Sequence, residues 1–180
     1  MDIWEIKKNN QNSYMIKKNE LMLKCQIGLA GIVDYNKKIE GDKKTPAGEW
    51  NFKRIFYRSD RIDLGEMIYR SFIPLQKITK NCGWCDDKKS KKYNQYIKIK
   101  EKDLTFPFSY EKLWRDDKVY DLFIELDYNN QPVILNKGSA IFIHCSFKDY
   151  RPTSGCIAIH QENLIDLVQN IKGETKIIIN

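Results

Sequence analysis

A cysteine and a histidine separated by a short loop are the residues of this chain best suited to chemistry. Cys156 follows Thr153, Ser154 and Gly155, and His144, one of only two histidines, lies shortly before them. A thiol nucleophile needs a base to take its proton and backbone N–H groups to hold the oxyanion. We therefore predict a nucleophilic Cys156 with His144 as its base, and oxyanion support from Thr153, Ser154 and Gly155. A thiolate beside an imidazolium has a lowered pKa, so we expect this for Cys156.

Two apolar runs must position this pair. Residues 140–143 lead into His144, and residues 157–159 follow Cys156. Short apolar runs bounded by turn residues are typical of buried strands. If the two strands lie side by side, the imidazole can reach the thiol. The alternative is a plain turn that feeds a strand, with the thiol merely packed in the core.

The remaining patterns predict a single, mainly β, sandwich-like domain over residues 1–180, with one or two short helices. Residues 49–57 and 119–126 have strand character, and residues 132–135 are expected to pair with the latter as a hairpin. Residues 162–171 have helical spacing, and residues 109–114 could form one helical turn.

Composition excludes several classes of function. The chain has 31 basic and 24 acidic residues, but its net charge of +7 is spread along the sequence, so we predict no nucleic-acid partner. No stretch approaches the length of a membrane span. Five irregularly spaced cysteines do not indicate a disulfide framework. The N-terminus lacks the features of a signal peptide, which is expected of a cytoplasmic chain unless a leader was removed or another export route exists.

Two separated motifs, in order, resemble one enzyme family. Gly41–Gly48 reads G-D-K-K-T-P-A-G, and His144 is followed by T-S-G-C-I at residues 153–157. They are similar to the G-D-x-x-T-P-x-G and H…S-x-G-C motifs of the L,D-transpeptidase catalytic domain, the YkuD-type fold. Residues 83–87, 114–121 and 138–144 resemble a bacterial branch of that family. The resemblance runs from about Gly28 to the C-terminus.

The resemblance implies a peptidoglycan L,D-transpeptidase that works in the periplasm or cell envelope on stem peptides, without metal or cofactor. Cys156 would attack the peptide bond after the third residue of a stem tetrapeptide, forming an acyl-thioester. An amine from a second stem would resolve it to a 3–3 cross-link. The oligomeric state is left open.

The sequence departs from the family pattern where a substrate carboxylate would bind. Ala158 stands where the family often has Arg, so a positive group must come from elsewhere, and Arg115 and Arg151 are the candidates by residue type. Asp121 could orient His144. The residues that we expect near substrate are Trp84, Asp86, Trp114, Arg115, Tyr120 and Arg151.

Three rival functions remain open at this point. The same chemistry with water as acceptor gives an L,D-carboxypeptidase or a cysteine peptidase. The absence of Arg at position 158 keeps a non-catalytic wall-binding module open as an alternative. The C-x-x-C spacing of Cys82 and Cys85 is found in redox pairs and in half of a zinc site; our preferred interpretation of this segment is a loop that lines the cleft.

Overall fold

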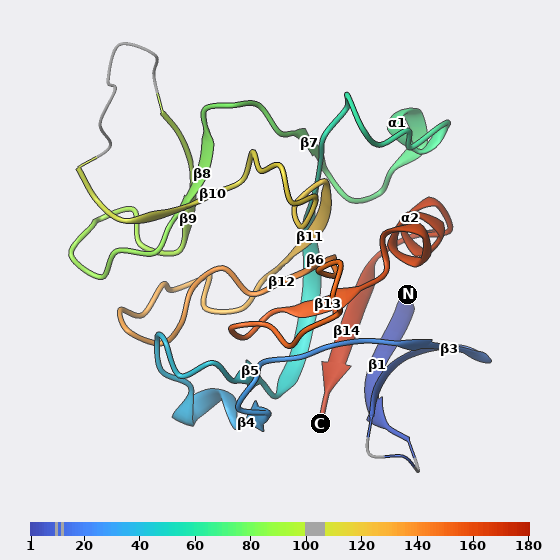
Figure 1. The fold of residues 1–180 in the computed structure, drawn as a ribbon, viewed down its shortest axis with the longest axis horizontal. Coiled ribbons are helices and arrows are strands. Elements are labelled where there is room, and N and C mark those ends of the chain that lie inside the picture. Colours follow the sequence, from blue (N-terminus) through green and yellow to red (C-terminus); the bar gives the residue numbers. More distant parts are fainter. Residues whose placement is uncertain (10, 12, 100–106) are drawn as a thin grey trace.

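A computed structural model describes residues 1–9, 11, 13–99 and 107–180. In these residues the strands form three sheets around one long central strand, β6 (Figure 1). The strands are β1 (Asp2–Lys8), β2 (Tyr14–Lys18), β3 (Leu21–Lys24), β4 (Ile32–Val33), β5 (Thr45–Pro46), β6 (Gly48–Tyr57), β7 (Leu75–Lys77), β8 (Cys82–Cys85), β9 (Gln95–Lys98), β10 (Tyr110–Lys112), β11 (Leu122–Leu126), β12 (Phe142–Cys145), β13 (Ile157–Ile159) and β14 (Thr175–Ile179). The helices are α1 (Met67–Arg70), α2 (Gln161–Gln169) and a 3-10 turn at Tyr35–Lys37.

The large sheet has the order β13-β12-β11-β6-β14-β1-β2-β3, with β7 also paired to β6. Most neighbours are antiparallel, but three pairs run parallel, namely β12 with β13, β1 with β14, and β6 with β7. The strands β10-β8-β9 form the second sheet, and β4-β5 form the third. The expectation of a mainly β, sandwich-like fold with short helices is confirmed.

Alternating side chains build a different core on each face of the large sheet. On one face Ile55, Ile124 and Ile143 pack with α2 and the N-terminal strands. On the other face Phe56, Phe123 and Phe142 pack with the three-stranded sheet. This alternation follows from the period of two along a strand. Figure 1 shows α2 and the three-stranded sheet on opposite sides of the central strands. Among the described residues no helix is long and apolar enough to cross a bilayer.

Three local expectations are wrong. Residues 132–135 form no strand, and β11 pairs instead with β6 and β12; Pro132 has no N–H to give to a ladder. Residues 110–112 are strand β10 rather than a helical turn, because they pair with β8. Residues 82–85 are β8 itself, the buried central strand of the three-stranded sheet, and not a loop.

Candidate active site

Strand pairing brings Cys156 and His144 to the same face of the large sheet. In the parallel pair β12–β13, Ile143 lies opposite Ile157 and His144 opposite Ala158. Cys156, the residue before β13, therefore continues the register opposite Phe142. His144 is two residues after Phe142 on the same strand, so both side chains point to the same face. The predicted side-by-side placement of the two apolar runs is confirmed.

The hydrogen bond of His144 selects its tautomer. Its Nδ1 lies 2.8 Å from the carbonyl oxygen of Cys145. A carbonyl can only accept, so Nδ1 carries the proton and Nε2 is left as the basic nitrogen. The orienting group is thus a backbone carbonyl. Asp121, which we considered for this role, instead accepts a hydrogen bond from Arg61 at 3.0 Å.

The thiol of Cys156 is held by two backbone groups. It donates to the carbonyl oxygen of Ala140 at 2.9 Å and accepts from the Phe142 N–H at 3.4 Å. Ala140 has φ = 52°, a left-handed conformation that a residue with a Cβ rarely adopts. Its N–H donates to the side-chain oxygen of Asn94 at 3.0 Å, which supports that conformation. The thiol proton is therefore hydrogen bonded to a backbone carbonyl.

Burial keeps both members of the pair neutral. It raises the pKa of Cys156 to about 12, opposed by the Phe142 N–H and by the charge of Lys38. It lowers the pKa of His144 to about 4, opposed by the hydrogen bond to Cys145. The expectation of a lowered thiol pKa is wrong. The hydration that a thiolate or an imidazolium would lose on burial outweighs the favourable contacts around each group. At neutral pH the resting pair is a thiol and an imidazole.

The G-D-K-K-T-P-A-G segment holds the turn before Cys156. The hydroxyl of Thr45 donates to the Gly155 carbonyl at 2.8 Å and accepts from the Gly28 N–H at 2.9 Å. Gly155 has φ = 142°, and a Cβ there would lie 2.9 Å from the carbonyl oxygen of Lys44. Only glycine fits this turn without strain.

Of the residues expected to support the oxyanion, Thr153 hydrogen bonds within the turn itself. Its hydroxyl donates to the Cys156 carbonyl at 2.6 Å and accepts from the Gly155 N–H at 3.1 Å. The Gly155 amide is thus already engaged. Ser154 is exposed at the tip of the turn.

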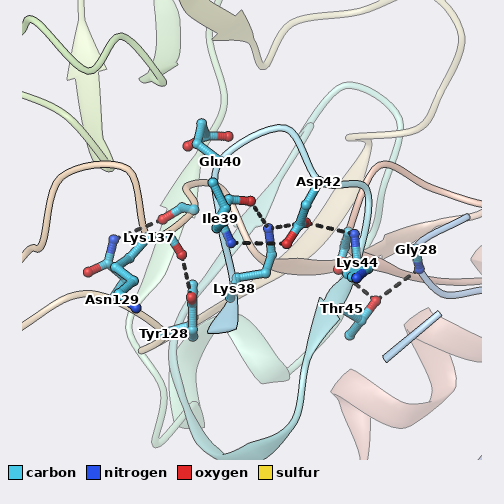
Figure 2. A network of polar contacts seen from close by, with 12 residues as sticks. Gly28, Lys38, Ile39, Glu40, Asp42, Lys44, Thr45, Tyr128, Asn129 and Lys137 are labelled. Carbon is cyan, nitrogen blue, oxygen red and sulfur yellow. Dashed lines mark hydrogen bonds and ion pairs between the residues drawn. The ribbon is translucent and has the colours of Figure 1, made fainter. Parts of the chain in front are cut away.

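An ion pair between Lys38 and Asp42 supports the G-D-K-K-T-P-A-G segment. Lys38, only 2% exposed, donates to Asp42 at 2.7 Å and to the Ile39 carbonyl at 2.9 Å. Asp42 also accepts from the backbone N–H groups of Ile39 and Lys44, and these contacts and the lysine charge hold its pKa low against burial. Figure 2 shows Lys38 enclosed by these partners, with Thr45 beside Gly28. Sequence reasoning missed Lys38, since a lysine in a basic run is usually a solvated one.

Some residues expected near substrate do lie around the pair. The ring of Tyr120 packs edge-on against the His144 ring, with centroids 5.5 Å apart. Glu111, which we had not predicted, hydrogen bonds to Tyr120 and Arg115, while burial raises its pKa. Arg115 contacts Glu111 at 2.7 Å and Asp117 at 2.5 Å, so two carboxylates already neutralise it.

The other expected substrate contacts have different surroundings. Trp84 is buried and packs edge-on against Phe142, with centroids 4.9 Å apart. Asp86 is partly buried and raises the pKa of Glu111 through its charge. The Arg58 guanidinium lies 3.2 Å from the ring centre of Trp114 and covers it.

Arg151 lies on the exposed loop after β12. Its guanidinium lies 4.1 Å from the ring centre of Phe147, which itself packs edge-on toward His144. Ala158 is fully buried beside His144. The position where the family often has Arg thus provides no charge here.

Cys82 and Cys85 are separate buried thiols on β8. The Cys82 sulfur lies 3.0 Å from the hydroxyl of Tyr96 and 3.2 Å from that of Thr79. Within residues 1–9, 11, 13–99 and 107–180, no group of three or more side chains could hold a metal ion.

The sequence profile of the L,D-transpeptidase catalytic domain, YkuD, matches residues 2–179. The chain belongs to this family. The match includes the N-terminal strands, which lie before the segment in which we had recognised the motifs. No curated protein matches this L,D-transpeptidase domain.

Two solved structures resemble the L,D-transpeptidase domain described here. L,D-transpeptidase 1 from Mycobacterium tuberculosis is 8% identical with a TM-score of 0.38, over 99% of this chain and 60% of that one. An L,D-transpeptidase from Mycobacterium smegmatis is 9% identical with a TM-score of 0.38, over 99% of this chain and 58% of that one. The chain thus spans about three fifths of the length of these structures.

Proposed function

We propose that this chain is a peptidoglycan L,D-transpeptidase with Cys156 as nucleophile and His144 as general base. The observation that carries the proposal is the placement of both residues on one sheet face, with the imidazole proton held on Nδ1 by the Cys145 carbonyl. That tautomer leaves Nε2 to accept the thiol proton. The family membership supplies the substrate class.

The neutral resting pair determines the order of events. The thiol leaves the Ala140 carbonyl and transfers its proton to Nε2 of His144 as sulfur attacks the carbonyl after the third stem residue. The amide N–H groups of Ser154 and Cys156 receive the oxyanion, because that of Gly155 already donates to Thr153. The proton passes to the departing D-residue, whose amine leaves, and an acyl-thioester forms. A second amine then attacks the thioester and loses a proton to His144. The C–S bond breaks, and the Cys156 thiolate takes that proton back, which restores the neutral pair.

The identity of the acceptor, an amine or water, distinguishes the transpeptidase from the carboxypeptidase. Water in place of the amine gives an L,D-carboxypeptidase with the same residues. We propose the transpeptidase, acting in the cell envelope where stem peptides are found. A wall-binding module is disfavoured because binding alone does not need a fixed histidine tautomer on the same sheet face as a thiol.

Purified tetrapeptide muropeptides test the proposal directly. We expect cross-linked dimers, or exchange of the terminal D-residue, with the wild type and none with Cys156→Ala. Tripeptide as the sole product identifies the carboxypeptidase instead. A carbapenem should form an adduct, visible by intact-protein mass spectrometry, only when Cys156 is present. An adduct of equal yield on Cys156→Ala would disprove the assignment of the nucleophile.

A further inference from the structure

A pocket lies on the same sheet face as Cys156 but over different strands. Its volume is about 270 Å³, and its walls include Lys53 and Arg54 of β6, Glu125 of β11 and Asn130. Gln95 and Tyr96 of the three-stranded sheet close the other side. Pockets for drug-sized ligands start at roughly 300 Å³, so this one suits a smaller molecule.

Glu125 is the buried charged group of this pocket. It is 1% exposed, and its Oε2 accepts from the Arg54 Nε at 2.6 Å. Its Oε1 is also buried but has no hydrogen-bond partner within the described part of the chain. The Lys53 Nζ lies 3.6 Å away, which is close enough for an ion pair but too far for a hydrogen bond. A buried carboxylate oxygen without a donor is costly, so the pocket has an unused acceptor.

A β-bulge directs two consecutive cations toward that carboxylate. Glu125 lies opposite Arg54, whereas the next residue, Leu126, lies opposite Phe52. Lys53 is therefore the extra residue, and such a bulge re-aims a side chain that would otherwise point to the other face. Asn130 holds the Lys53 ammonium at 2.6 Å. Two cations and one carboxylate leave the pocket with a net positive charge.

The aromatic walls position the Arg54 guanidinium. Its central carbon lies 5.0 Å from the ring centre of Phe56 and 5.5 Å from that of Tyr96. Within the described residues its Nε bonds to Glu125, and no partner is seen for its two terminal nitrogens. These nitrogens form a planar pair of donors, the arrangement that matches a carboxylate.

We propose that this pocket binds a small zwitterion with adjacent carboxylate and ammonium groups, namely an α-amino acid. The ligand carboxylate contacts Arg54 and Lys53, and its ammonium donates to Oε1 of Glu125. A simple anion would leave that oxygen unpaired and would be repelled by it. A simple cation would be repelled by the two basic side chains. The α-amino acid satisfies both requirements at once.

The pocket shares a wall with the candidate active site. Trp84 lines the pocket and packs against Phe142, whose N–H contacts the Cys156 sulfur. The side-chain oxygen of Asn94 accepts from both the Trp84 indole and the Ala140 N–H. The Trp84 indole N–H is therefore a sensitive reporter of binding. Binding itself needs no acyl transfer, so the proposal stands or falls independently of the proposed function.

Titration of the whole chain by ¹H–¹⁵N NMR tests the site. The probes are L-alanine, D-alanine, acetate and methylammonium. We expect at least one alanine enantiomer to shift the Trp84 indole and the Asn130 side-chain amide. Acetate and methylammonium, which each make half of the contacts, should need concentrations at least about tenfold higher. The Trp50 indole, bonded to the Pro46 carbonyl near the start of β6 and outside the pocket lining, should not move.

Two variants and a control complete the test. Glu125→Gln should weaken alanine binding by at least about tenfold, because it removes the charge that faces the ammonium. Lys53→Gln, at a half-exposed position, should weaken it with the fold intact. Lys176→Gln should not, because Lys176 lies on β14 and pairs with Glu49 of β6. If Glu125→Gln fails to fold, Lys53→Gln decides alone. Equal binding of acetate and alanine, absence of the shifts, or unchanged binding by the variants would overturn the proposal.

Discussion

The hydroxyl of Thr45 donates to the carbonyl of Gly155 at 2.8 Å, across 110 positions of sequence. The same oxygen accepts from the Gly28 N–H, so one buried side chain ties together three segments. The turn that presents Cys156 is thus held from outside by the T-P segment. The two motifs that identify the family are therefore parts of one hydrogen-bonded unit.

Replacing Thr45 by Val should destabilise the protein and slow acylation. The shape is kept, but a buried N–H and a buried carbonyl lose their partner, at about 1–3 kcal/mol each. Chemical unfolding and carbapenem adduct formation measure the two effects. Thr45→Ser, which keeps the hydroxyl, is the control. A Val variant with wild-type stability and acylation rate would show that the bond does not hold the turn.

Gly155→Ala should be far more harmful than Gly173→Ala. At Gly155 the added Cβ meets the Lys44 carbonyl at 2.9 Å, and φ is 142°. At Gly173 nothing lies within 4 Å of the added atom. We expect a loss of about 1–3 kcal/mol or more for the former, with little acylation, and a small effect for the latter. Similar unfolding midpoints for both variants would contradict the strained turn.

Stability should depend on pH through His144. Its pKa falls from an ordinary 6.5 to about 4 in the folded chain. Between these values the unfolded chain binds a proton that the folded chain does not, so stability is lost as pH falls from about 6.5 to 4. The expected loss is about 3 kcal/mol. Urea unfolding of the wild type and of His144→Gln at several pH values measures it. The dependence of stability on pH between about 4 and 6.5 should be weaker in the variant. Parallel curves for the two proteins would show that folding does not lower the pKa of His144.

The thiol of Cys156 should react slowly with iodoacetamide at neutral pH. Burial raises its pKa to about 12, and only the thiolate attacks. Its alkylation should therefore be slower than that of glutathione at pH 7 and increase with pH beyond 9. Peptide mass spectrometry follows Cys156 against time, with Cys156→Ala confirming the modified site. Fast alkylation that is independent of pH near neutrality would instead indicate a preformed thiolate–imidazolium pair.

The His144→Ala variant separates the base from the scaffold. We expect it to fold and to acylate more slowly by a factor of about 10²–10⁴, as for loss of a general base. The carbapenem adduct rate provides the measurement, and circular dichroism checks the fold. Acylation at the wild-type rate would remove His144 from the mechanism.

Local patterns were sufficient for much of the fold and for the candidate pair. Apolar runs and their periodicity predicted β6, β11, β12 and α2, because burial of one face imposes its period on the chain. Expectations failed at residues 110–112 and 132–135, where pairing with a distant strand, or its absence, outweighs the local signal.

The sequence by itself determined the family, the mainly β architecture and the choice of Cys156 and His144, since these depend on residue type and order. Tertiary structure alone decided the charge state of that pair, because a pKa depends on how much water the fold removes. It also decided that a backbone carbonyl orients His144, that Lys38 is buried, and that Glu125 shares a pocket with two cations. Each of these requires groups that meet only when distant strands pair.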